Sequence, residues 1–514
     1  MVVETNAMVR AVFAVLLSAT VWGLGGTSRS ESCPRATDDA VFVSPAERRE
    51  GHTVASFYKV FRNTKAVRKA MLAATALGVF EVEVNGARVG NDFLKPGFTG
   101  CGRCRHVYTY DVTDLLKREA DAENCILAQV APTWWCDQIN TPAKPTPWQL
   151  GKEVAFRCEL KLEYGDGSHE TVRTGPDWLA AYSARTQTAG LYEGEVYDSR
   201  ESIDWLKPAK VNTEFRGELR PATAKIALRE DLALEPKAIY VTCGAEGATA
   251  DAYGRAKIVR RYRDGEKIAL NPGEQLVVDF GQNCSAVPSF QFDGRPGTQL
   301  EIRHAEMLNE SNGEKCRGND GPAGTPYLAS LRSAYAGIRY TFAGGGDTYR
   351  PSFTFFGYRY LGVTTTAPVT FQRIRSVPVS SITKEMERGA ITTGDAHVNR
   401  LIENIRWGLR SNYISIPTDC PQRDERLGWT ADTQVFMNSA AYLADTCEFL
   451  RKYLADLRDG QYDDGLYTCF VPNVRHVFPH WASCGWTDAG VLIPYRLWKW
   501  YGRTEILDEC WDSM

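Results

Sequence analysis

The sequence predicts a multidomain protein with two N-terminal antiparallel β-sandwich domains followed by an all-α region. Its 514 residues are too many for one hydrophobic core, so about three domains are expected. Short apolar runs separated by Gly, Asn and Asp turns fill most of residues 52–382. Near Ile382 the apolar period becomes helical. Because strands and helices occupy separate stretches of the chain, they should form separate domains.

The N-terminal 33 residues are typical of a signal peptide and leader. Arg10 precedes an apolar run, residues 11–26, that is too short and too Gly-rich at its end for a membrane span. Cys33 follows Ser30-Glu-Ser32, which lacks the small and apolar residues of a lipoprotein site. The sequence therefore predicts an exported protein, periplasmic or extracellular, with no membrane attachment after cleavage.

The first β-sandwich is expected over residues 34–265. Val79–Val84 alternates apolar and polar residues, Asn85-Gly86 supplies a tight turn, and the alternation resumes at Ala87, which predicts a hairpin. Residues 158–164, followed by the turn-forming run 165–168, predict another strand and turn.

The second β-sandwich is expected over residues 266–382. The strands that predict it are Gln275–Phe280, ending at Gly281, Gln299–Arg303 and Tyr358–Val363. A loop rich in Gly, Asn and Asp, residues 311–326, interrupts them. Because a loop of this length in a compact domain is more often functional than idle, we expect it to serve a site.

The helical region is expected over residues 383–514. Apolar residues recur at helical spacing at Val398, Leu401, Ile402, Ile405 and Leu409. The stretch from Asp432 to about Arg458 is rich in Ala and Leu and contains no Pro or Gly. Residues 487–501 predict a further helix.

Composition excludes some classes of partner. The net charge is -3 with both signs interspersed, so the chain has neither the footprint of a nucleic-acid binder nor a polybasic membrane anchor. The 13 Trp, 23 Tyr and 21 Phe suit stacking on sugar rings, although burial in large β domains explains them equally well. The 14 cysteines are scattered, and Cys101-Gly-Arg-Cys104 near His106 has no second pair at zinc spacing. We therefore expect free or locally paired cysteines and no metal ligands.

One loop concentrates chemistry between the first two helical stretches. Residues 418–432 contain five ionisable groups within nine residues, Asp419, Arg423, Asp424, Glu425 and Arg426, and Pro417, Pro421 and Gly428 keep them out of regular helix. Glycosidic cleavage needs a carboxylic acid to protonate the leaving oxygen, and arginine and carboxylate groups can bind sugar hydroxyls. Trp429 can stack on a sugar ring. The alternative is a solvated loop held together by Asp–Arg pairs.

The run Asp419-Cys-Pro-Gln-Arg-Asp-Glu-Arg-Leu-Gly-Trp429 resembles, nearly letter for letter, the signature of bacterial α-L-rhamnosidases, glycoside hydrolase family 78. Weaker resemblances follow in the expected order. Val82-Glu-Val-Asn-Gly-Ala-Arg-Val-Gly90 and Lys95-Pro-Gly-Phe-Thr99 are similar to the family's N-terminal β domain. Val278-Asp-Phe-Gly-Gln-Asn283 and Phe353–Tyr360 are similar to its concanavalin-like sandwich, and Gly485-Trp-Thr-Asp-Ala489 to its (α/α)6 barrel.

The resemblance implies roles for individual residues in the hydrolysis of terminal α-L-rhamnose by an inverting acid/base mechanism. Glu425 matches the family's general acid, and Asp424 is expected to be structural. The residues that match the rhamnose-binding positions are Asp419, Arg423, Trp429 and Asp432, with Trp486 and Asp488 as further candidates. Asp488 could equally be an acid that favours the first turn of a helix. The partner would be a rhamnose-containing glycoside or polysaccharide.

The resemblance also implies what this chain leaves out. The family's catalytic base is a downstream Glu that should fall beyond Met514, so residues 383–514 would form an incomplete (α/α)6 barrel, and this chain alone is expected to be inactive. No cofactor is required for the chemistry. A structural calcium in the N-terminal β domain is compatible with related rhamnose-binding modules, and its ligands are not assigned.

Two other functions remain open at this stage. A helical toroid also hosts other exo-acting hydrolases and lyases, although the acidic motif argues against them. A non-catalytic carbohydrate-binding protein, with β domains that bind rhamnose-bearing glycans, is the second alternative. The sequence leaves the natural substrate, its linkage and the oligomeric state open.

Overall fold

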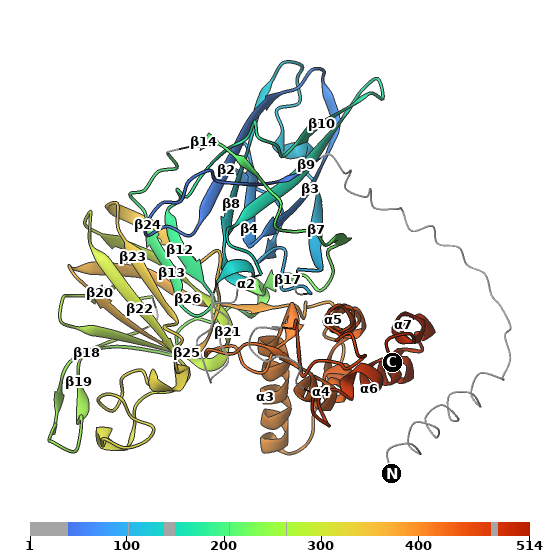
Figure 1. Ribbon diagram of the computed structural model, residues 1–514. Coiled ribbons are helices and arrows are strands. Elements are labelled where there is room, and N and C mark those ends of the chain that lie inside the picture. Colours follow the sequence, from blue (N-terminus) through green and yellow to red (C-terminus); the bar gives the residue numbers. More distant parts are fainter. Residues whose placement is uncertain (1–39, 101, 138–149, 205, 264, 474–481) are drawn as a thin grey trace, which may run out of the picture. The chain divides into compact units, whose positions relative to one another are not determined.

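The computed structural model describes residues 40–100, 102–137, 150–204, 206–263, 265–473 and 482–514 (Figure 1). The chain divides into two compact units, residues 1–35 and 36–514, and the described residues all belong to the second. The predicted signal peptide and leader, residues 1–33, lie outside the described residues.

The first part of the described chain contains two sheets. The seven-stranded sheet has the order β15 (Lys210–Asn212), β1 (Phe42–Ser44), β9 (Ala155–Tyr164), β3 (Val67–Leu77), β7 (Cys104–Asp111) and β16 (Glu218–Pro221), with β10 (His169–Arg173) paired to β9. The six-stranded sheet has the order β14 (Lys207–Pro208), β11 (Leu179–Ala181), β2 (Ala55–Arg62), β8 (Glu123–Ala131), β4 (Val79–Val84) and β5 (Ala87–Arg88).

One apolar core lies between these two sheets. Leu72 and Leu160 of the first sheet share a fully buried cluster with Phe57 and Phe80 of the second. Alternation along each strand produces this arrangement, because successive side chains of a strand point to opposite faces. The predicted hairpins are confirmed, with Glu83 opposite Arg88 across the Asn85-Gly86 turn and His169 opposite Glu163 in β10 and β9.

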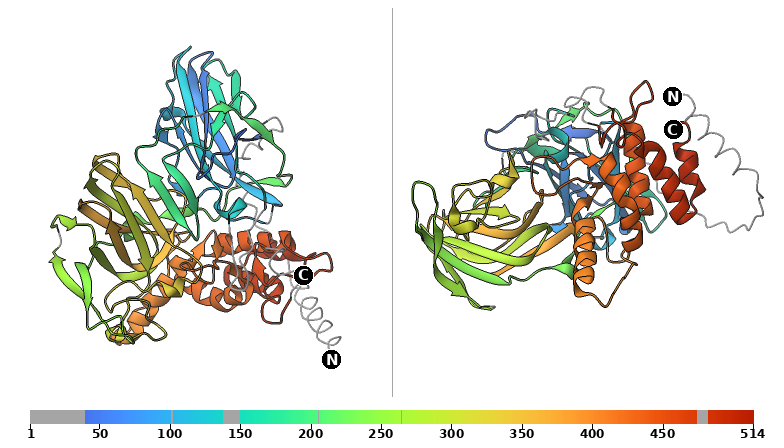
Figure 2. Two further views of the ribbon diagram at one scale, coloured as in Figure 1. Left: turned by 60° about the vertical axis from the view of Figure 1, so that its left-hand side comes forward. Right: turned by 90° about the horizontal axis from the view of Figure 1, so that it is seen from below.

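The second β region is a single curled sheet of 13 strands, green to yellow in Figure 2. Its main order is β12 (Thr186–Gly190), β13 (Gly194–Asp198), β23 (Gly337–Thr341), β22 (Gln299–Ala305), β25 (Phe356–Thr365), β21 (Gln275–Gly294), β26 (Val369–Ser380), β17 (Ile226–Leu228) and β6 (Asp92–Phe93). The remaining four strands are β18 (Ala238–Glu246), β19 (Arg255–Tyr262), β20 (Ile268–Leu270) and β24 (Gly345–Tyr349).

Strand pairing in this sheet differs from the sequence-based expectation in three respects. Hairpins β12–β13 and β18–β19 precede residue 265 yet pair within the 13-stranded sheet, so pairing crosses the expected domain boundary. Strand β13 runs parallel to β23, as β16 does to β7. Strand β21 continues through Gly281, because a register shift between Asp279 and Cys284 absorbs the left-handed glycine, whose φ is 72°.

The chain then becomes helical, as predicted. The helices after residue 382 are α3 (Ala396–Asn412), α4 (Thr430–Leu443), α5 (Cys447–Asp459), α6 (Ala489–Tyr501) and α7 (Thr504–Cys510), and α2 (Thr133–Cys136) is a single turn in the first β region. Short strand pairs β27 (Tyr413–Ile414) with β28 (Ile416–Pro417) and β29 (Gly428–Trp429) with β30 (Phe470–Val471) separate them. The 3₁₀ turns are η1 (Thr113–Leu115), η2 (Glu230–Leu232), η3 (Ser311–Gly313) and η4 (Ala329–Leu331).

The continuous helical stretch expected from Asp432 to Arg458 is interrupted after Leu443. The backbone N–H of Asp445 donates to the carbonyl of Met386 at 2.8 Å, and that of Thr446 donates to the Tyr501 hydroxyl at 3.1 Å. These tertiary hydrogen bonds replace intrahelical ones, and composition alone contains no signal for them.

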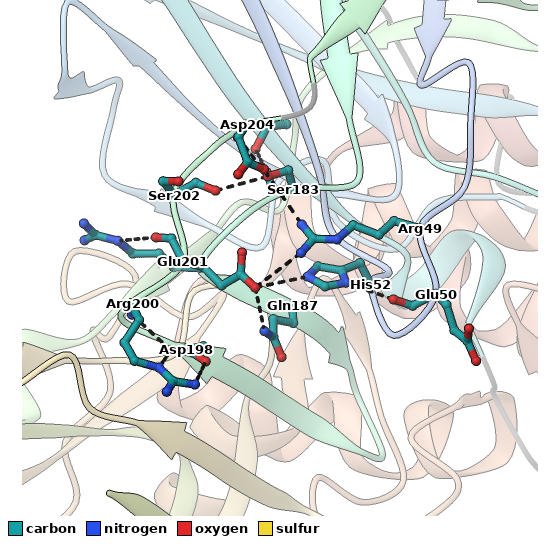
Figure 3. Close-up of polar contacts among 12 residues, drawn as sticks. Arg49, Glu50, His52, Ser183, Gln187, Asp198, Arg200, Glu201, Ser202 and Asp204 are labelled. Carbon is teal, nitrogen blue, oxygen red and sulfur yellow. Dashed lines mark hydrogen bonds and ion pairs between the residues drawn. The ribbon is translucent and has the colours of Figure 1, made fainter. Parts of the chain in front are cut away.

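A polar cluster connects the six-stranded sheet to the 13-stranded sheet (Figure 3). Glu201 Oε1 accepts hydrogen bonds from Arg49 Nη2 at 3.4 Å and from Gln187 Nε2 at 3.3 Å, and His52 Nε2 lies 3.9 Å away. Arg49 and His52 precede β2, whereas Gln187 belongs to β12. The segment after β13 therefore anchors β12 to the start of β2.

Apart from Cys469, the cysteines that the structure describes are free, one of the two states expected for a scattered set. Cys33 and Cys101 lie outside the described residues. Among the described helices, none has the length and apolar character that crossing a bilayer requires.

A buried ion pair joins α5 to the first β region. Lys452 Nζ lies 2.6 Å from Asp456 Oδ2, and both side chains are buried. The ammonium also donates to the carbonyls of Phe98 and Ser415, while Asp456 Oδ1 accepts from the Gly100 N–H at 3.0 Å. A helix and a loop more than 350 residues away therefore share one charge pair.

We predict that Lys452→Met lowers the free energy of unfolding by about 3–5 kcal/mol, because it leaves the Asp456 carboxyl buried without its cation. Urea denaturation followed by circular dichroism measures the loss. The double variant Lys452→Met/Asp456→Asn should recover most of it, since the amide can still accept from Gly100. A loss below about 1 kcal/mol for the single variant would contradict the role assigned to this pair.

Candidate functional site

The acidic motif forms an irregular loop between β28 and α4, as predicted. Its two ends are joined by reciprocal hydrogen bonds: the Asp419 N–H donates to the Leu427 carbonyl at 3.0 Å, and the Leu427 N–H donates to Asp419 Oδ1 at 2.9 Å. Between them Arg426 has a φ of 56°, in the left-handed region that non-glycine residues rarely adopt. The loop is therefore closed on itself and held in a defined shape.

Arg426 anchors this loop in the protein interior. Its guanidinium is buried over the rings of Tyr192 and Phe355 and donates to the carbonyls of Phe355 and Gln422, both at 3.2 Å. Burial lowers the pKa of Arg426. Because Tyr192 and Phe355 lie next to strands of the 13-stranded sheet, the contact attaches the motif loop to that sheet.

Glu425 is buried and meets three donors. Its Oε2 lies 2.5 Å from Arg332 Nη2 and 3.2 Å from Arg423 Nη2, and its Oε1 accepts from Trp429 Nε1 at 3.1 Å. The Glu425 backbone carbonyl accepts from the Tyr192 hydroxyl at 2.6 Å. Both the carboxyl group and the backbone of this residue are thus fixed in orientation.

Asp419 lies beside this carboxyl group. Burial, with a contribution from the nearby charge of Glu425, raises the pKa of Asp419 to about 6. Arg423 Nη2 lies 3.7 Å from Asp419 Oδ2, an oxygen that accepts no hydrogen bond in the described structure. Asp419 is therefore a carboxyl group that changes charge near neutral pH and has one oxygen available to a ligand.

Trp429 and Asp432 complete the group around Glu425. The half-buried Trp429 ring packs edge-to-face on Phe470 with centroids 5.3 Å apart, across the β29–β30 pair. Asp432 lies in the first turn of α4, where burial raises its pKa and the Glu425 charge adds to the shift. The structure thus brings Asp419, Arg423, Trp429 and Asp432 together around Glu425.

The other two candidates lie apart from this carboxyl. Trp486 is half-buried with its Nε1 unpaired, and Asp488 is exposed at the start of α6, where its Oδ2 accepts from the Gly485 N–H at 3.1 Å. Gln434 of α4 donates to the Gly485 carbonyl and so connects this turn to the motif helix. Within the described residues, no hydrogen bond or ion pair joins Trp486 or Asp488 to Glu425.

The 13-stranded sheet contributes residues that sequence reasoning missed. Arg332 bridges Glu425 and Asp424, with its Nε 3.0 Å from Asp424 Oδ1, and Ser333 donates to Asp424 Oδ2 through both its hydroxyl and its N–H. Both residues follow the loop 311–326, which the sequence marked as functional, within the same β22–β23 connection. Asp424 is therefore engaged in structural contacts, as expected.

A second carboxylate from this sheet borders the motif. Burial raises the pKa of Glu306, which follows β22 and accepts from Asn283 Nδ2 at 2.8 Å and from the Gln422 side chain. Asn283 belongs to the Val278–Asn283 run quoted above. Sequence reasoning used that run only as a sign of the fold, because a one-dimensional pattern does not show which loops meet.

Several buried polar atoms in this region have no partner in the described structure. They are Asp419 Oδ2, Gln422 Oε1, Arg423 Nε and Trp486 Nε1. Buried polar groups are normally hydrogen-bonded, so atoms of this kind near one another indicate a site that a polar ligand completes.

Ligand atoms of Asp419, Cys420 and Glu425 lie within 4.8 Å of one another, a spacing that could hold a metal ion. Both oxygens of Glu425, however, already accept from arginine and indole donors. A second cluster consists of Cys104, Asp456 and Asp459. There the two carboxylates already form ion pairs, Asp456 with Lys452 and Asp459 with Arg220. These cationic donors make both clusters poor metal sites.

Models of three bacterial α-L-rhamnosidase domains match the chain in succession. The N-terminal domain matches residues 65–231, the concanavalin-like domain 268–380 and the six-hairpin glycosidase domain 386–514. The chain belongs to the bacterial α-L-rhamnosidase family. Its motif loop and helices α4–α7 fall in the six-hairpin domain, and Arg332 and Glu306 fall in the concanavalin-like domain.

Characterised relatives and solved structures agree with this membership. An α-L-rhamnosidase of Streptomyces avermitilis is 36% identical over 88% of this chain, and one of Alteromonas sp. is 32% identical over 88%. The structure of Streptomyces avermitilis α-L-rhamnosidase complexed with L-rhamnose superposes with a TM-score of 0.72 at 32% identity over 90% of this chain. The chain spans 40%, 45% and 41% of the lengths of these three proteins.

We predict that Asp419→Asn stabilises the protein by about 3 kcal/mol at pH 8 and has little effect at pH 4. The pKa of about 6 lies above the ordinary value of 3.8, so the folded state holds a proton that the unfolded state has lost. Wild-type stability should therefore fall as pH rises from about 4 to 6, and the amide removes that fall. Urea denaturation at the two pH values tests it. A stability difference that does not change with pH would contradict the buried titration.

Proposed function

We propose that the protein is a glycoside hydrolase that removes terminal, non-reducing α-L-rhamnose from glycosides or polysaccharides by an inverting mechanism. The family membership supports the reaction class, and the relative from Streptomyces avermitilis has been observed with L-rhamnose. The observation that carries the proposal is the fixed carboxyl of Glu425 amid buried polar atoms that lack partners.

Glu425 is the general acid in this proposal. Two guanidinium groups donate to its Oε2, so that oxygen remains an acceptor, and Oε1 is the oxygen that carries the transferable proton. The indole N–H of Trp429 has to leave Oε1 when the ring turns towards the sugar. As the bond from the anomeric carbon to the leaving oxygen breaks, the proton passes from Oε1 to that oxygen.

The remaining residues bind the sugar. Arg423 Nε and Asp419 Oδ2 have no hydrogen-bond partner and can bind adjacent hydroxyls, and Asp432 lies near enough to Glu425 to reach the same ring. The Trp429 face suits the C–H surface and the methyl group of a 6-deoxyhexose. Trp486 and Asp488 are assigned to the outer wall of the site, because Gln434 of α4 donates to the carbonyl of Gly485, in the same turn.

Inversion requires a water molecule on the opposite ring face and a carboxylate about 6.5–9.5 Å from the acid to accept its proton. We assign no residue of this chain to that base. We further propose that the β regions are sandwich domains, that residues 383–514 contribute to an (α/α)6 barrel, and that the protein is exported. A structural calcium ion in the N-terminal β domain remains part of the proposal.

We predict that Glu425→Gln, in the protein expressed from its native gene, lowers kcat for an alkyl α-L-rhamnoside by at least about 100-fold and preserves rhamnose binding. Hydrolysis of 2,4-dinitrophenyl α-L-rhamnoside should fall far less, because that leaving group departs without a proton. Glu387→Gln is the matched control. Its carboxyl is equally buried and pairs with three arginines, Arg229, Arg406 and Arg410, away from the motif.

Near-normal hydrolysis of the alkyl rhamnoside by Glu425→Gln would refute the acid assignment. The stereochemical proposal is checked separately by proton NMR during the first minutes of the wild-type reaction. The β-anomer of L-rhamnose should appear first, and initial release of the α-anomer would show retention instead.

A further inference from the structure

We propose that Arg332, contributed by the concanavalin-like domain, is a positioning residue that orients the carboxyl of Glu425 for proton donation. The inference rests on the proposed function and extends it, because it gives a β domain a direct part in the reaction of the helical domain. Arg332 does not reach the sugar in this proposal. It acts through Glu425.

The contact geometry supports this role. Arg332 donates through Nη2 to Glu425 Oε2, and its Nε forms an ion pair with Asp424 Oδ1 at 3.0 Å, so one planar guanidinium contacts two consecutive carboxyl groups. A planar fork of this kind restricts rotation of both acceptors, which a single ammonium cannot do. Arg423 reaches Oε2 at 3.2 Å, but it also faces Asp419 and is assigned to the sugar. Arg332 therefore has no other described carboxyl partner than the Asp424–Glu425 pair.

The backbone conformation at Arg332 also supports this role. Its φ of 59° and ψ of -118° lie outside the regions that residues with a Cβ normally occupy. Such a conformation is energetically unfavourable and persists only where the surrounding structure enforces it. On both sides of Arg332 the chain is buried, at Leu331 and Ala334, and Ser333 donates to the same Asp424 carboxyl.

The long loop before it holds this turn in place. Asp320 Oδ2 accepts from the N–H groups of Leu328 and Ala329, at 2.8 and 2.7 Å, where η4 begins. Asp320 is fixed in turn by its own N–H, which donates to Asn309 Oδ1 at 2.8 Å. Residues 311–326, predicted to serve a site, thus connect to Glu425 through η4 and Arg332.

The fixed carboxyl has a chemical consequence. With Oε2 held by Arg332, the plane of the carboxyl group is set and Oε1 points in one direction. Proton transfer depends steeply on the alignment of donor and acceptor, so a freely rotating carboxyl would protonate the leaving oxygen less often. Loss of Arg332 should therefore slow the steps that need the proton and spare those that do not.

The experiment compares Arg332→Ala with Arg220→Ala in the protein expressed from its native gene. Arg220 is the matched control, because it also connects a β region to the helices through a carboxylate, Asp459 at 2.7 Å, and is 33% exposed against 31% for Arg332. Kinetics are measured on an alkyl α-L-rhamnoside and on 2,4-dinitrophenyl α-L-rhamnoside. The expected result for Arg332→Ala is a fall in kcat of about 10–100-fold on the alkyl substrate and of less than about 3-fold on the activated one.

Four further measurements separate positioning from general damage. Guanidinium chloride at millimolar concentration should restore part of the alkyl-rhamnoside activity of Arg332→Ala. Arg332→Lys should be intermediate, because it keeps the charge and loses the fork. In the Glu425→Gln background, Arg332→Ala should add no further loss, because both act on the same proton transfer. Asp320→Ala should reproduce the substrate dependence of Arg332→Ala with a smaller amplitude.

The outcomes distinguish this inference from the proposed function. Equal losses on both substrates, unchanged kinetics, or the same substrate dependence in Arg220→Ala would overturn the role of Arg332 while leaving the hydrolase in place. A wild-type protein that cleaves neither rhamnoside would refute the proposed function itself.

Discussion

The arrangement of the site depends on one buried cation. Arg426 carries its charge into the protein interior, where a guanidinium is stable only if its donors find acceptors. It finds them in the carbonyls of Arg423, Gln422 and Phe355, together with the faces of two aromatic rings. Because two of those carbonyls belong to the motif loop and one to the 13-stranded sheet, satisfying this charge fixes the loop against the sheet. The orientation of Glu425, the residue immediately before it in the chain, follows.

This constraint explains why the site is shared between two domains. Once Arg426 holds the loop against the sheet, the β22–β23 connection and Tyr192, between β12 and β13, come within hydrogen-bond distance of Glu425. The carboxyl then receives donors from both sides, Arg423 and Trp429 from its own loop and Arg332 from the sheet. Each donor is fixed by a different part of the chain, so the geometry does not rest on the short motif alone.

The sequence predicted those features of the fold that depend on neighbouring residues alone. The Asn85-Gly86 hairpin, helix α3 and the irregular loop framed by Pro417, Pro421 and Gly428 all follow from periodicity and turn residues, and the structure contains each of them. The cluster of Asp419, Arg423, Trp429 and Asp432 around Glu425 could also be predicted, because these residues lie within one turn or loop of each other. Family resemblance, rather than spacing, distinguished Glu425 from Asp424.

The remaining features depend on contacts between distant segments. Nothing near Arg332 in the sequence indicates that it meets Glu425, since 93 residues separate them. The break between α4 and α5 is decided by Met386 and Tyr501. The β12–β13 hairpin joins the 13-stranded sheet because β13 pairs with β23, which follows more than 130 residues later. A one-dimensional pattern reports propensity and periodicity, whereas these features arise from tertiary hydrogen bonds that override propensity.

The shared construction of the site has a consequence for stability as well as for chemistry. The ion pair of Lys452 and Asp456 attaches α5 to residues 98–100 of the first β region, and Arg220 adds a second connection through Asp459. The helices that carry the motif are therefore held by two β regions at once, by the first through α5 and by the second through Arg426. Losing the attachment through Arg426 would let the motif loop shift relative to Arg332, whereas without Arg220 the Lys452–Asp456 pair still holds α5 to the first β region. A shift of about 1 Å is enough to misalign a proton donor, so the acid depends on contacts far from the sugar.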